Sequence, residues 1–294
     1  MKYTKTFVKL RDKAIKIFVK TGLDRYAAKL SAKYFNRSYH KRFYKEMEKR
    51  RNGKIDDRYI KLKQVQGIHE GERCFIVCNG PSLKIDDLNT LHQSGEFTFG
   101  LNSIFKLFDK TDWRPDYYVC MDKRPYNELV SDPNFELVKN KFLPDYFFLD
   151  SSFPDDCFVF PLEYYEVGIY GWQQHFSDDI YVVAYGATTV TSLAMQIAAY
   201  MGFKEIYLIG CDNNFSVKNN TNHAEGIEYK KVLKAAKNAV ERNEKGYETA
   251  RKHCEERGIK IYNATRGGKL EVFPRVDFDS LFEEDIDNDK KADQ

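Results

Sequence analysis

Residues 73–83 read RCFIVCNGPSL, in which five consecutive apolar residues run directly into Asn-Gly-Pro-Ser. An unbroken apolar run of this length is typical of a strand that is covered on both faces. Gly80 lets the backbone approach a neighbouring group, and Pro81 suits the first turn of a helix. The stretch therefore predicts a buried strand leading into a helix, with the Ser82 and Leu83 amides free to meet an anion. An ordinary strand-to-helix turn is the alternative.

Further short apolar runs follow, and helical patterns separate several of them. In all, strands are expected over residues 74–78, 97–101, 117–121, 146–149, 180–184, 205–210 and 259–262. Helices are expected over 188–201 and 227–257, the second ending at Gly258. This alternation predicts an α/β domain with a mostly parallel, doubly wound sheet and helices on both faces. Ligands of such sheets bind at the carboxyl ends of the strands.

Charge is distributed unevenly along the 294 residues. Residues 1–66 hold 21 of the 47 lysines and arginines but only 6 of the 44 acidic residues. We expect a basic helical extension over 1–66, the α/β domain over 67–280 and an acidic tail over 281–294. Apolar residues between the cations of the extension suit an anionic membrane surface. The alternative is a helix that packs on its own domain or on another subunit; no nucleic-acid-binding motif accompanies the charge.

The cysteines and the apolar segments indicate the compartment. None of the six cysteines forms a Cys-x-x-Cys pair, so neither a zinc site nor a disulfide framework is expected. The amino terminus has no signal-peptide pattern. The uncharged run 181–203 contains many hydroxyl residues, which favours a buried strand, a turn and a helix over a membrane span. We expect a cytoplasmic protein, peripheral on the inner face of the membrane if the extension binds lipid.

Polar residues follow the second and third expected strands. Asn102 offers a donor and an acceptor to a ribose or a base edge, or it caps the next helix. Asp122 suits hydroxyls or a metal ion. Lys123 and Arg124 suit a carboxylate or a phosphate. A solvated loop is the alternative for these three residues.

Three later segments carry further candidates. Hydroxyl residues, among them Thr189, Thr191 and Ser192, gather at a helix start and form a second anion-binding end. Asp212 ends a buried strand. His223 lies in a polar loop, and its ordinary pKa of about 6.5 suits a general base near neutral pH. The segment NATRGG at 263–268 either closes over a ligand or simply reverses the chain.

Taken together, these segments resemble a known group, the motility accessory factors and hydroxymethylpterin pyrophosphokinase-like proteins. That group is itself similar to the bacterial sialyltransferases of glycosyltransferase family 42. The resemblance covers about residues 73–270 and rests on CNGPSL, LNSIF, RPDYYVCMD, GATTVTSLAMQIAAYMGFKEIYLIGCD, NHAEG and NATRGG, in that order. The sequence departs from the sialyltransferase pattern at Cys78, where those enzymes usually carry glycine.

The resemblance implies a Rossmann-like fold and, from the transferases, a nonulosonic sugar donor activated as its cytidine monophosphate (CMP) ester. It matches His223 to a histidine that serves as the base, and we expect Lys123 and Arg124 to pair with the carboxylate of the sugar. The resemblance and the position of polar residues at the carboxyl ends of the expected strands together indicate the nucleotide site. The residues expected to bind the nucleotide and its phosphate are Asn79, Gly80, Pro81, Ser82, Asn102, Asp122, Thr189, Thr191, Ser192 and Asp212.

The resulting expectation is an inverting glycosyltransferase that needs no metal or other cofactor. Its partners are the CMP-nonulosonate donor, a surface glycan or lipid-linked acceptor and an anionic membrane surface, and a homo-oligomer stays open. A diphosphokinase is the alternative enzyme; it moves pyrophosphate from ATP to a pterin-like alcohol and uses Mg²⁺ with Asp122 and Asp212 as ligands. A non-catalytic assembly module with a degenerate nucleotide fold is the third reading.

Overall fold

The computed structural model describes residues 37–148, 152–163, 175–186, 189–214, 224, 227 and 239–283. The chain divides into two compact units, residues 1–56 with 148–152 and residues 57–147 with 153–294. The first unit contains helix α3 (Arg37–Arg51), on which Lys49 pairs with Glu46 at 2.7 Å. Residues 1–36 of the predicted basic extension (1–66) lie outside the described residues, and its residues 57–66 belong to the second unit.

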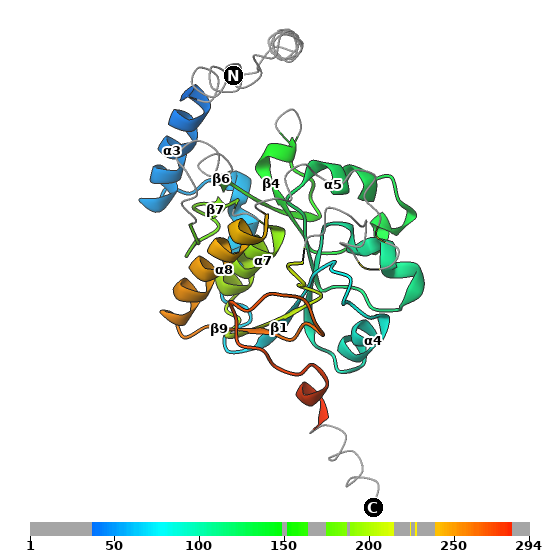
Figure 1. The fold of residues 1–294 in the computed structure, drawn as a ribbon. Helices are drawn as coiled ribbons and strands as arrows, with labels where there is room; N and C mark the ends of the chain where they lie inside the picture. Colours follow the sequence, from blue (N-terminus) through cyan, green and yellow to red (C-terminus); the bar gives the residue numbers. More distant parts are fainter. Residues whose placement is uncertain are drawn as a thin grey trace, which may run out of the picture. The chain divides into compact units, whose positions relative to one another are not determined.

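The second unit is built on a parallel sheet of seven strands (Figure 1). In spatial order these are β5 (Cys157–Phe160), β4 (Lys141–Pro144), β3 (Tyr117–Val119), β2 (Phe97–Leu101), β1 (Arg73–Val77), β8 (Glu205–Ile209) and β9 (Lys260–Asn263). Every pairing in this sheet is parallel. The predicted Rossmann-like, doubly wound sheet is therefore confirmed.

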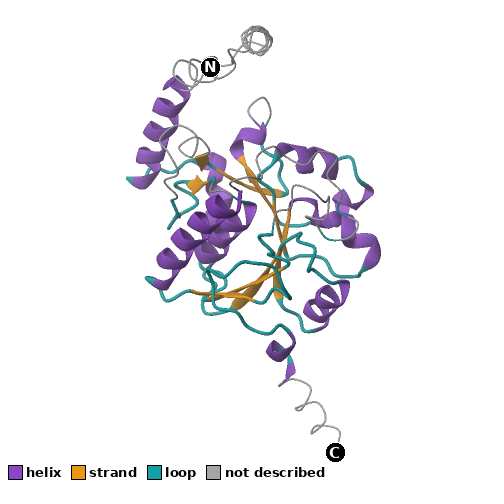
Figure 2. Ribbon diagram, viewed as in Figure 1, coloured by secondary structure: helices purple, strands orange, loops and turns teal. Residues whose placement is uncertain are grey.

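The strands read as continuous apolar runs because helices cover both faces of the sheet. Helices α7 (Val190–Met201) and α8 (Ala239–Glu255) pack together on one face, and α4 (Ile85–Gln93) and α5 (Lys123–Leu129) lie on the other (Figures 1 and 2). The chain adds strands on one side of β1 first and on its other side later. Because crossovers between parallel strands are right-handed, the helices of the two halves lie on opposite faces of the sheet. Residues 74–77 of β1 are consequently fully buried.

Short 3₁₀ helices precede, connect and follow the strands. They are the 3₁₀ segments η2 (Asp57–Gln64), η3 (Asn102–Lys110), η4 (Pro133–Leu137), η5 (Asp145–Phe148) and η7 (Asp279–Leu281). Phe278 and Phe282 flank η7, and their rings lie 6.2 and 5.9 Å from that of Phe75 on β1. The end of the described chain is thus fastened to the sheet.

Two strand predictions were wrong at the β4 edge. Residues 146–148 of the predicted strand 146–149 belong to η5, whereas the strand itself is Lys141–Pro144. Lys141 can lie in a buried strand because its ammonium pairs with Asp156 at 2.6 Å and lies 4.7 Å from the ring of Phe135. Strand β5 (Cys157–Phe160) was not predicted at all.

The strand predicted over 180–184 was also mostly wrong. Asp179 closes a turn there, because its carboxylate accepts from the Tyr181 amide at 2.9 Å and its carbonyl accepts from the Val182 and Val183 amides at 3.0 Å. Only β7 (Ala184–Tyr185) follows, paired with β6 (Leu162–Glu163) in a separate two-stranded sheet.

The two predicted helices are present, with somewhat different bounds. Helix α7 begins at Val190 against the predicted 188, and α8 occupies 239–255 of the predicted 227–257, with residues 228–238 outside the described residues. Gly258 follows α8 with a φ of +68°, as its expected capping role requires. In the part of the chain that the structure describes, no helix has the length and apolar character needed to cross a membrane.

Candidate functional site

The order of the sheet reverses between β1 and β8. Strands β2 to β5 are added on one side of β1, whereas β8 and β9 are added on the other. The turns that follow β1 and β8 meet at this point, where the Gly80 amide donates to the Gly210 carbonyl at 2.8 Å. In open α/β sheets this crevice is where ligands bind.

Gly80 passes too close to β8 to carry a side chain. A Cβ atom at this position would lie 2.0 Å from Oδ2 of Asp212 and 2.4 Å from the Gly210 carbonyl oxygen. The main chain at residue 80 therefore lies directly against the carboxylate that ends β8. The sequence argument, that glycine here permits a close backbone approach, agrees with this geometry.

The turn after β1 differs from the predicted helix start. The Leu83 amide donates to the Gly80 carbonyl at 3.1 Å, which closes a turn around Pro81 and Ser82, and α4 begins only at Ile85. The Ser82 amide and hydroxyl both donate to Oδ2 of Asp212, at 3.3 and 2.8 Å. The two amides expected to be free thus have acceptors within the protein, and a carboxylate already lies at the turn.

Two asparagines follow β1 and β2. Nδ2 of Asn79 donates to the Leu101 carbonyl at 2.9 Å, which places Asn79 against the end of β2. Asn102 comes next in the chain, with a φ of +46°. The carboxamide oxygens of both asparagines are buried and have no hydrogen-bond partner among the residues that the structure describes. Because buried polar atoms are nearly always paired, these two oxygens mark a place where a ligand can donate.

Asp122, Lys123 and Arg124 lie at the carboxyl end of β3, two strands from β1. All three residues are exposed, and Asp122 flanks the start of α5. Partial burial of its carboxyl nevertheless raises the pKa of Asp122, and the charge of Arg124 opposes that effect. The Lys123 ammonium donates to the Phe147 carbonyl at 3.3 Å. These groups share the sheet edge with the asparagines.

The hydroxyl residues of α7 are mostly engaged with the protein. Thr189 caps the helix by accepting from the Ser192 amide at 3.1 Å, and its hydroxyl donates to the Tyr247 hydroxyl at 3.4 Å. Thr191 and Ser192 are buried, and Oγ1 of Thr191 lies 3.4 Å from Sγ of Cys78. Thr189 alone of the three is partly exposed.

His223 lies outside the described residues, but its neighbour in the sequence is described. Ala224 is buried, and its amide donates to the Asn79 carbonyl at 2.8 Å. The chain is therefore fastened to the turn after β1 at the residue that follows His223.

The loop after β9 is fixed to the end of β8. The Thr265 hydroxyl accepts from the Cys211 amide at 3.0 Å, and the Lys269 amide donates to the Asp212 carbonyl at 2.7 Å. Gly268, at φ +72°, lies so close that a Cβ would be 2.5 Å from the Asp212 backbone. The loop predicted to close over a ligand or to reverse the chain is thus held in place by main-chain contacts.

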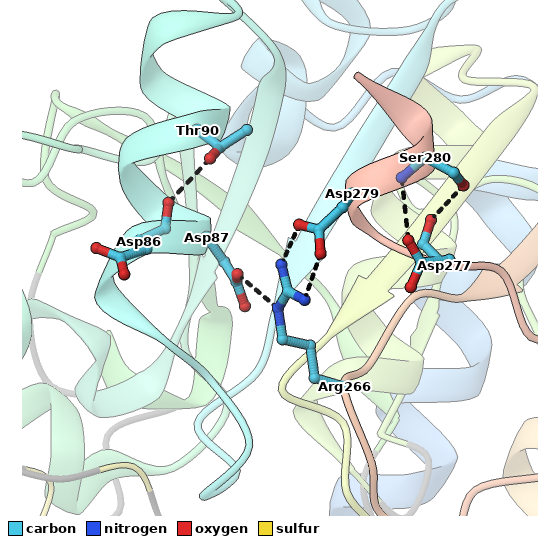
Figure 3. Close-up of polar contacts among 7 residues, drawn as sticks. All are labelled: Asp86, Asp87, Thr90, Arg266, Asp277, Asp279 and Ser280. Atoms are coloured by element: carbon cyan, nitrogen blue, oxygen red, sulfur yellow. Dashed lines mark hydrogen bonds and ion pairs between the residues drawn. The ribbon is translucent and has the colours of Figure 1, made fainter. Parts of the chain in front are cut away.

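Arg266 in this loop joins three elements (Figure 3). Its Nε donates to Asp87 on α4 at 2.8 Å, and its Nη1 donates to Asp279 on η7 at 2.8 Å. These bonds raise the pKa of Arg266 and lower that of Asp279. Burial raises the pKa of Asp87, and the hydrogen bond from Arg266 opposes this rise.

A cavity of about 710 Å³ opens between the turn before α4 and the chain after β9. We call it the β9-loop cavity. Its lining residues are Pro81, Ser82, Lys84, Thr265, Arg266, Gly267, Arg275, Val276 and Asp277. Since Pro81 and Ser82 also belong to the turn at the reversal point, the cavity adjoins the crevice between β1 and β8.

Several residues of the site were not found from the sequence. Tyr247 lies within the helix predicted over 227–257, eight residues before the end of α8. Its hydroxyl reaches that of Thr189 and lies 3.8 Å from Sγ of Cys211. Asn243 is buried, and its Nδ2 donates to Oδ1 of Asn213 at 3.4 Å. Their helical spacing indicates only that they face inward, so no sequence signal separates them from core residues.

The chain was compared with models of known protein families. The family described as "6-hydroxymethylpterin diphosphokinase MptE-like" matches residues 41–218. The chain belongs to this MptE-like family. The matched MptE-like region includes the turns after β1, β2, β3 and β8. The resemblance noted in the sequence is therefore confirmed at the level of the family.

Comparisons beyond the MptE-like family are sparser. No curated protein matches the chain. Among solved structures, a MAf glycosyltransferase from Magnetospirillum magneticum AMB-1 is similar with a TM-score of 0.46 and 15% sequence identity. That match covers 77% of this chain and 39% of the Magnetospirillum chain, so this chain spans about two-fifths of the length of that structure.

Proposed function

We propose that the protein is an inverting glycosyltransferase. In this proposal it transfers a sialic-acid-like nonulosonic sugar from a CMP-activated donor to a surface glycan or a lipid-linked acceptor. The single observation that carries the proposal is the pair of buried carboxamide oxygens on Asn79 and Asn102, which lack a partner within the described part of the chain and lie beside the reversal point of the sheet. Such a pair suits a nucleoside, because an amino group or a ribose hydroxyl supplies the missing donors.

Asp212 is proposed to bind the ribose. Its Oδ2 is already engaged by Ser82, whereas Oδ1 makes no hydrogen bond to the residues that the structure describes. A carboxylate accepts hydrogen bonds from hydroxyls but repels a phosphate. The phosphate is therefore proposed beyond Asp212, between the Asn79–Ser82 turn and the partly exposed Thr189, with buried Thr191 and Ser192 supporting the start of α7.

The remaining proposed roles follow from charge and position. Lys123 and Arg124 are the exposed cations at the same sheet edge, and in this proposal they pair with the carboxylate of the sugar. His223 takes the proton from the acceptor hydroxyl as that oxygen attacks the anomeric carbon. The bond from the anomeric carbon to the phosphate oxygen breaks, and the electron pair leaves with CMP.

Binding and turnover test this proposal separately. CMP should raise the melting temperature of the protein without added metal, and a CMP-nonulosonate should be consumed in the presence of an acceptor. His223→Ala should lower kcat by about 10²-fold or more while the Kd for CMP stays within about twofold. If CMP neither binds nor stabilises the wild type, the proposal is wrong.

The family description names a diphosphokinase, which is the alternative function. That reaction needs Mg²⁺ held by oxygen ligands, for which Asp122 and Asp212 are the candidates. Three strand intervals of about 4.8 Å separate β3 from β8, so the two aspartates begin roughly 14 Å apart. These residues do not fit a single shared ion. Stabilisation by ATP with Mg²⁺ and not by CMP would favour the kinase.

Membrane contact is proposed for the basic extension. Lysines and arginines of residues 1–66 would bring the enzyme to anionic lipid, where lipid-linked acceptors lie. Sedimentation of the full chain with phosphatidylserine vesicles should exceed that with phosphatidylcholine vesicles and fall at high salt. Equal sedimentation with both vesicles would remove this part of the proposal.

A further inference from the structure

The two arginines of the β9-loop cavity are held firmly by other parts of the protein. Arg266 is clamped between Asp87 and Asp279 (Figure 3). Arg275 pairs with Glu271 at 2.9 Å and also donates to the carbonyls of the β9 loop, including that of Thr265 at 3.2 Å. Their planar groups are therefore fixed before a ligand arrives, which lowers the entropy cost of binding.

These ion pairs also cancel the positive charge of the cavity. Lys84, Arg266 and Arg275 bring three cations to its wall. Four carboxylates lie on the wall or pair with it, namely those of Asp87, Asp277, Asp279 and Glu271. A site with this balance gives little attraction to a free phosphate or carboxylate. It suits an uncharged polar ligand.

Hydrogen-bonding groups of both kinds remain for such a ligand. A guanidinium has five N–H groups, of which Arg266 uses three in its bonds to the two aspartates. Asp277 receives the Ser280 amide on Oδ1 at 3.1 Å, and its Oδ2 makes no bond to the described residues. The Lys84 ammonium is exposed and has no ion-pair partner within the described part of the chain.

Sugar hydroxyls match this arrangement because each one both donates and accepts a hydrogen bond. Pro81 and Val276 add apolar surface against which the C–H face of a sugar ring can pack. The volume of about 710 Å³ falls within the range of roughly 300–1,000 Å³ that small-molecule sites occupy.

We propose that the β9-loop cavity binds a neutral, polyhydroxylated group, a sugar residue of the acceptor. The assignment to the acceptor rests on the proposed function, whereas the ligand class rests on the cavity itself. Since Ser82 borders both the cavity and the nucleotide turn, an acceptor sugar bound here lies beside the donor site. Lys84, Arg266 and Asp277 are then the residues that select the acceptor.

Direct binding tests the ligand class without a donor. Saturation-transfer NMR would be recorded on the full chain with the methyl glycosides of galactose, glucose and N-acetylglucosamine, and with inorganic phosphate in separate samples. We expect at least one glycoside to bind the wild type. Val276→Trp, which fills the cavity, should weaken that binding at least tenfold. Val130→Trp, at an exposed site after α5, is the matched control and should not change it.

A milder variant covers the case in which Val276→Trp does not fold. Asp277→Asn keeps the shape of the side chain but replaces an acceptor by a donor, and we expect it to weaken glycoside binding about tenfold. The Kd for CMP should stay within about twofold in both variants. Glycoside binding that is absent from the wild type, or unchanged in the folded variants, overturns the proposal.

The two proposals fail in distinguishable ways. If the wild type binds a glycoside in the cavity but not CMP, the proposed donor is wrong and the ligand class of the cavity stands. If the cavity variants weaken the binding of CMP or of inorganic phosphate tenfold, the cavity belongs to an anion and this inference is wrong.

Discussion

Oδ2 of Asp212, at the end of β8, accepts hydrogen bonds from both the amide and the hydroxyl of Ser82, in the turn after β1. The two residues are 130 positions apart, and their contact lies at the crevice where the strand order of the sheet reverses, between β1 and β8. A carboxylate thus occupies a position at which a phosphate-binding turn would meet its anion. The Ser82 amide is therefore already occupied by a carboxylate within the protein and is not free to bind a phosphate.

Asp212→Ala should therefore reduce both stability and nucleotide affinity. The buried side of the Ser82 turn loses its acceptor, at a cost of about 1–3 kcal/mol. In the proposed function the ribose also loses a partner, so the Kd for CMP should rise about tenfold. Guanidinium denaturation and calorimetric titration with CMP measure the two effects. A tighter Kd for CMP would instead show that the carboxylate competes with the phosphate.

Gly80→Ala should distort the turn after β1, on the opposite side of the crevice from Asp212. The new Cβ would overlap Oδ2 of Asp212 and the Gly210 carbonyl, so the turn must move, at about 1–3 kcal/mol. CMP affinity should fall at least tenfold. Gly95→Ala is the control, because that site is open but has a φ of +65°. It should cost about 1 kcal/mol and leave CMP binding unchanged. Equal CMP affinity in the two variants would contradict a site at Gly80.

Asn102→Gly separates backbone strain from ligand binding. Glycine accepts the φ of +46° without strain, while the variant removes the unpartnered carboxamide oxygen. The free energy of unfolding should stay within about 1 kcal/mol of the wild type, and CMP affinity should fall about tenfold. Asn140→Gly is matched in backbone conformation, at φ +44°, and should leave CMP affinity unchanged. Identical CMP titrations for both variants would exclude Asn102 from the site.

The Arg266 clamp predicts a specific dependence of stability on pH. The hydrogen bond from Arg266 lowers the pKa of Asp279 below 3.8, so this group stabilises the fold above that pH and ceases to do so as the pH falls through its folded-state pKa. At pH 7, Asp279→Asn should lose up to about 1 kcal/mol, because the pair is exposed. The difference from the wild type should shrink in denaturation experiments as the pH falls below about 4.

Asp87→Asn should show the opposite dependence of stability on pH. Burial raises the pKa of Asp87, so the wild type gains stability from this group as the pH falls through that raised value. The advantage of the wild type over Asp87→Asn should therefore grow in acid. The differences in unfolding free energy between the wild type and the two variants should change in opposite directions as the pH falls. A change in the same direction would contradict the arrangement of Arg266, Asp87 and Asp279 described above.

The cysteines should be unreactive although Cys78 lies at the site. A hydrogen bond with Cys211, together with burial, raises the pKa of Cys78, and burial raises the pKa of Cys120 and Cys254 to about 12. All six cysteines are buried and free. Because the thiolate is the reactive form, iodoacetamide at pH 8 should leave the native protein unmodified and alkylate all six after unfolding. Rapid modification of native Cys78 would contradict this placement.

Local sequence patterns were sufficient for the central part of the fold. The strands at 73–77, 97–101 and 205–209 are mostly apolar, and all but the first residue of each are buried, so their patterns are unambiguous. The patterns failed where a long-range contact overrides local preference. Lys141 enters a buried strand only because Asp156 neutralises it, and the run after Asp179 turns because that residue captures three amides.

The candidate site shows the same division. The rule that ligands bind at the carboxyl ends of parallel strands singled out Asn79, Asn102 and Asp212 from the sequence. It could not show that Asp212 takes the Ser82 amide, or that Arg266 reaches Asp87, which is 179 residues away. Such pairings depend on how the loops fold back in space, and no periodic pattern in the sequence encodes them.

The contacts of Gly80 with Gly210, and of Gly268 with Asp212, have a consequence for how this site can diversify. Both are main-chain contacts that need glycine at positions 80 and 268, so they depend on those two positions and not on the side chains around them. Residues around them, such as Lys84 and Asp277, can therefore change without rebuilding the framework. In the proposed function, a new acceptor preference then needs only a few substitutions at such positions.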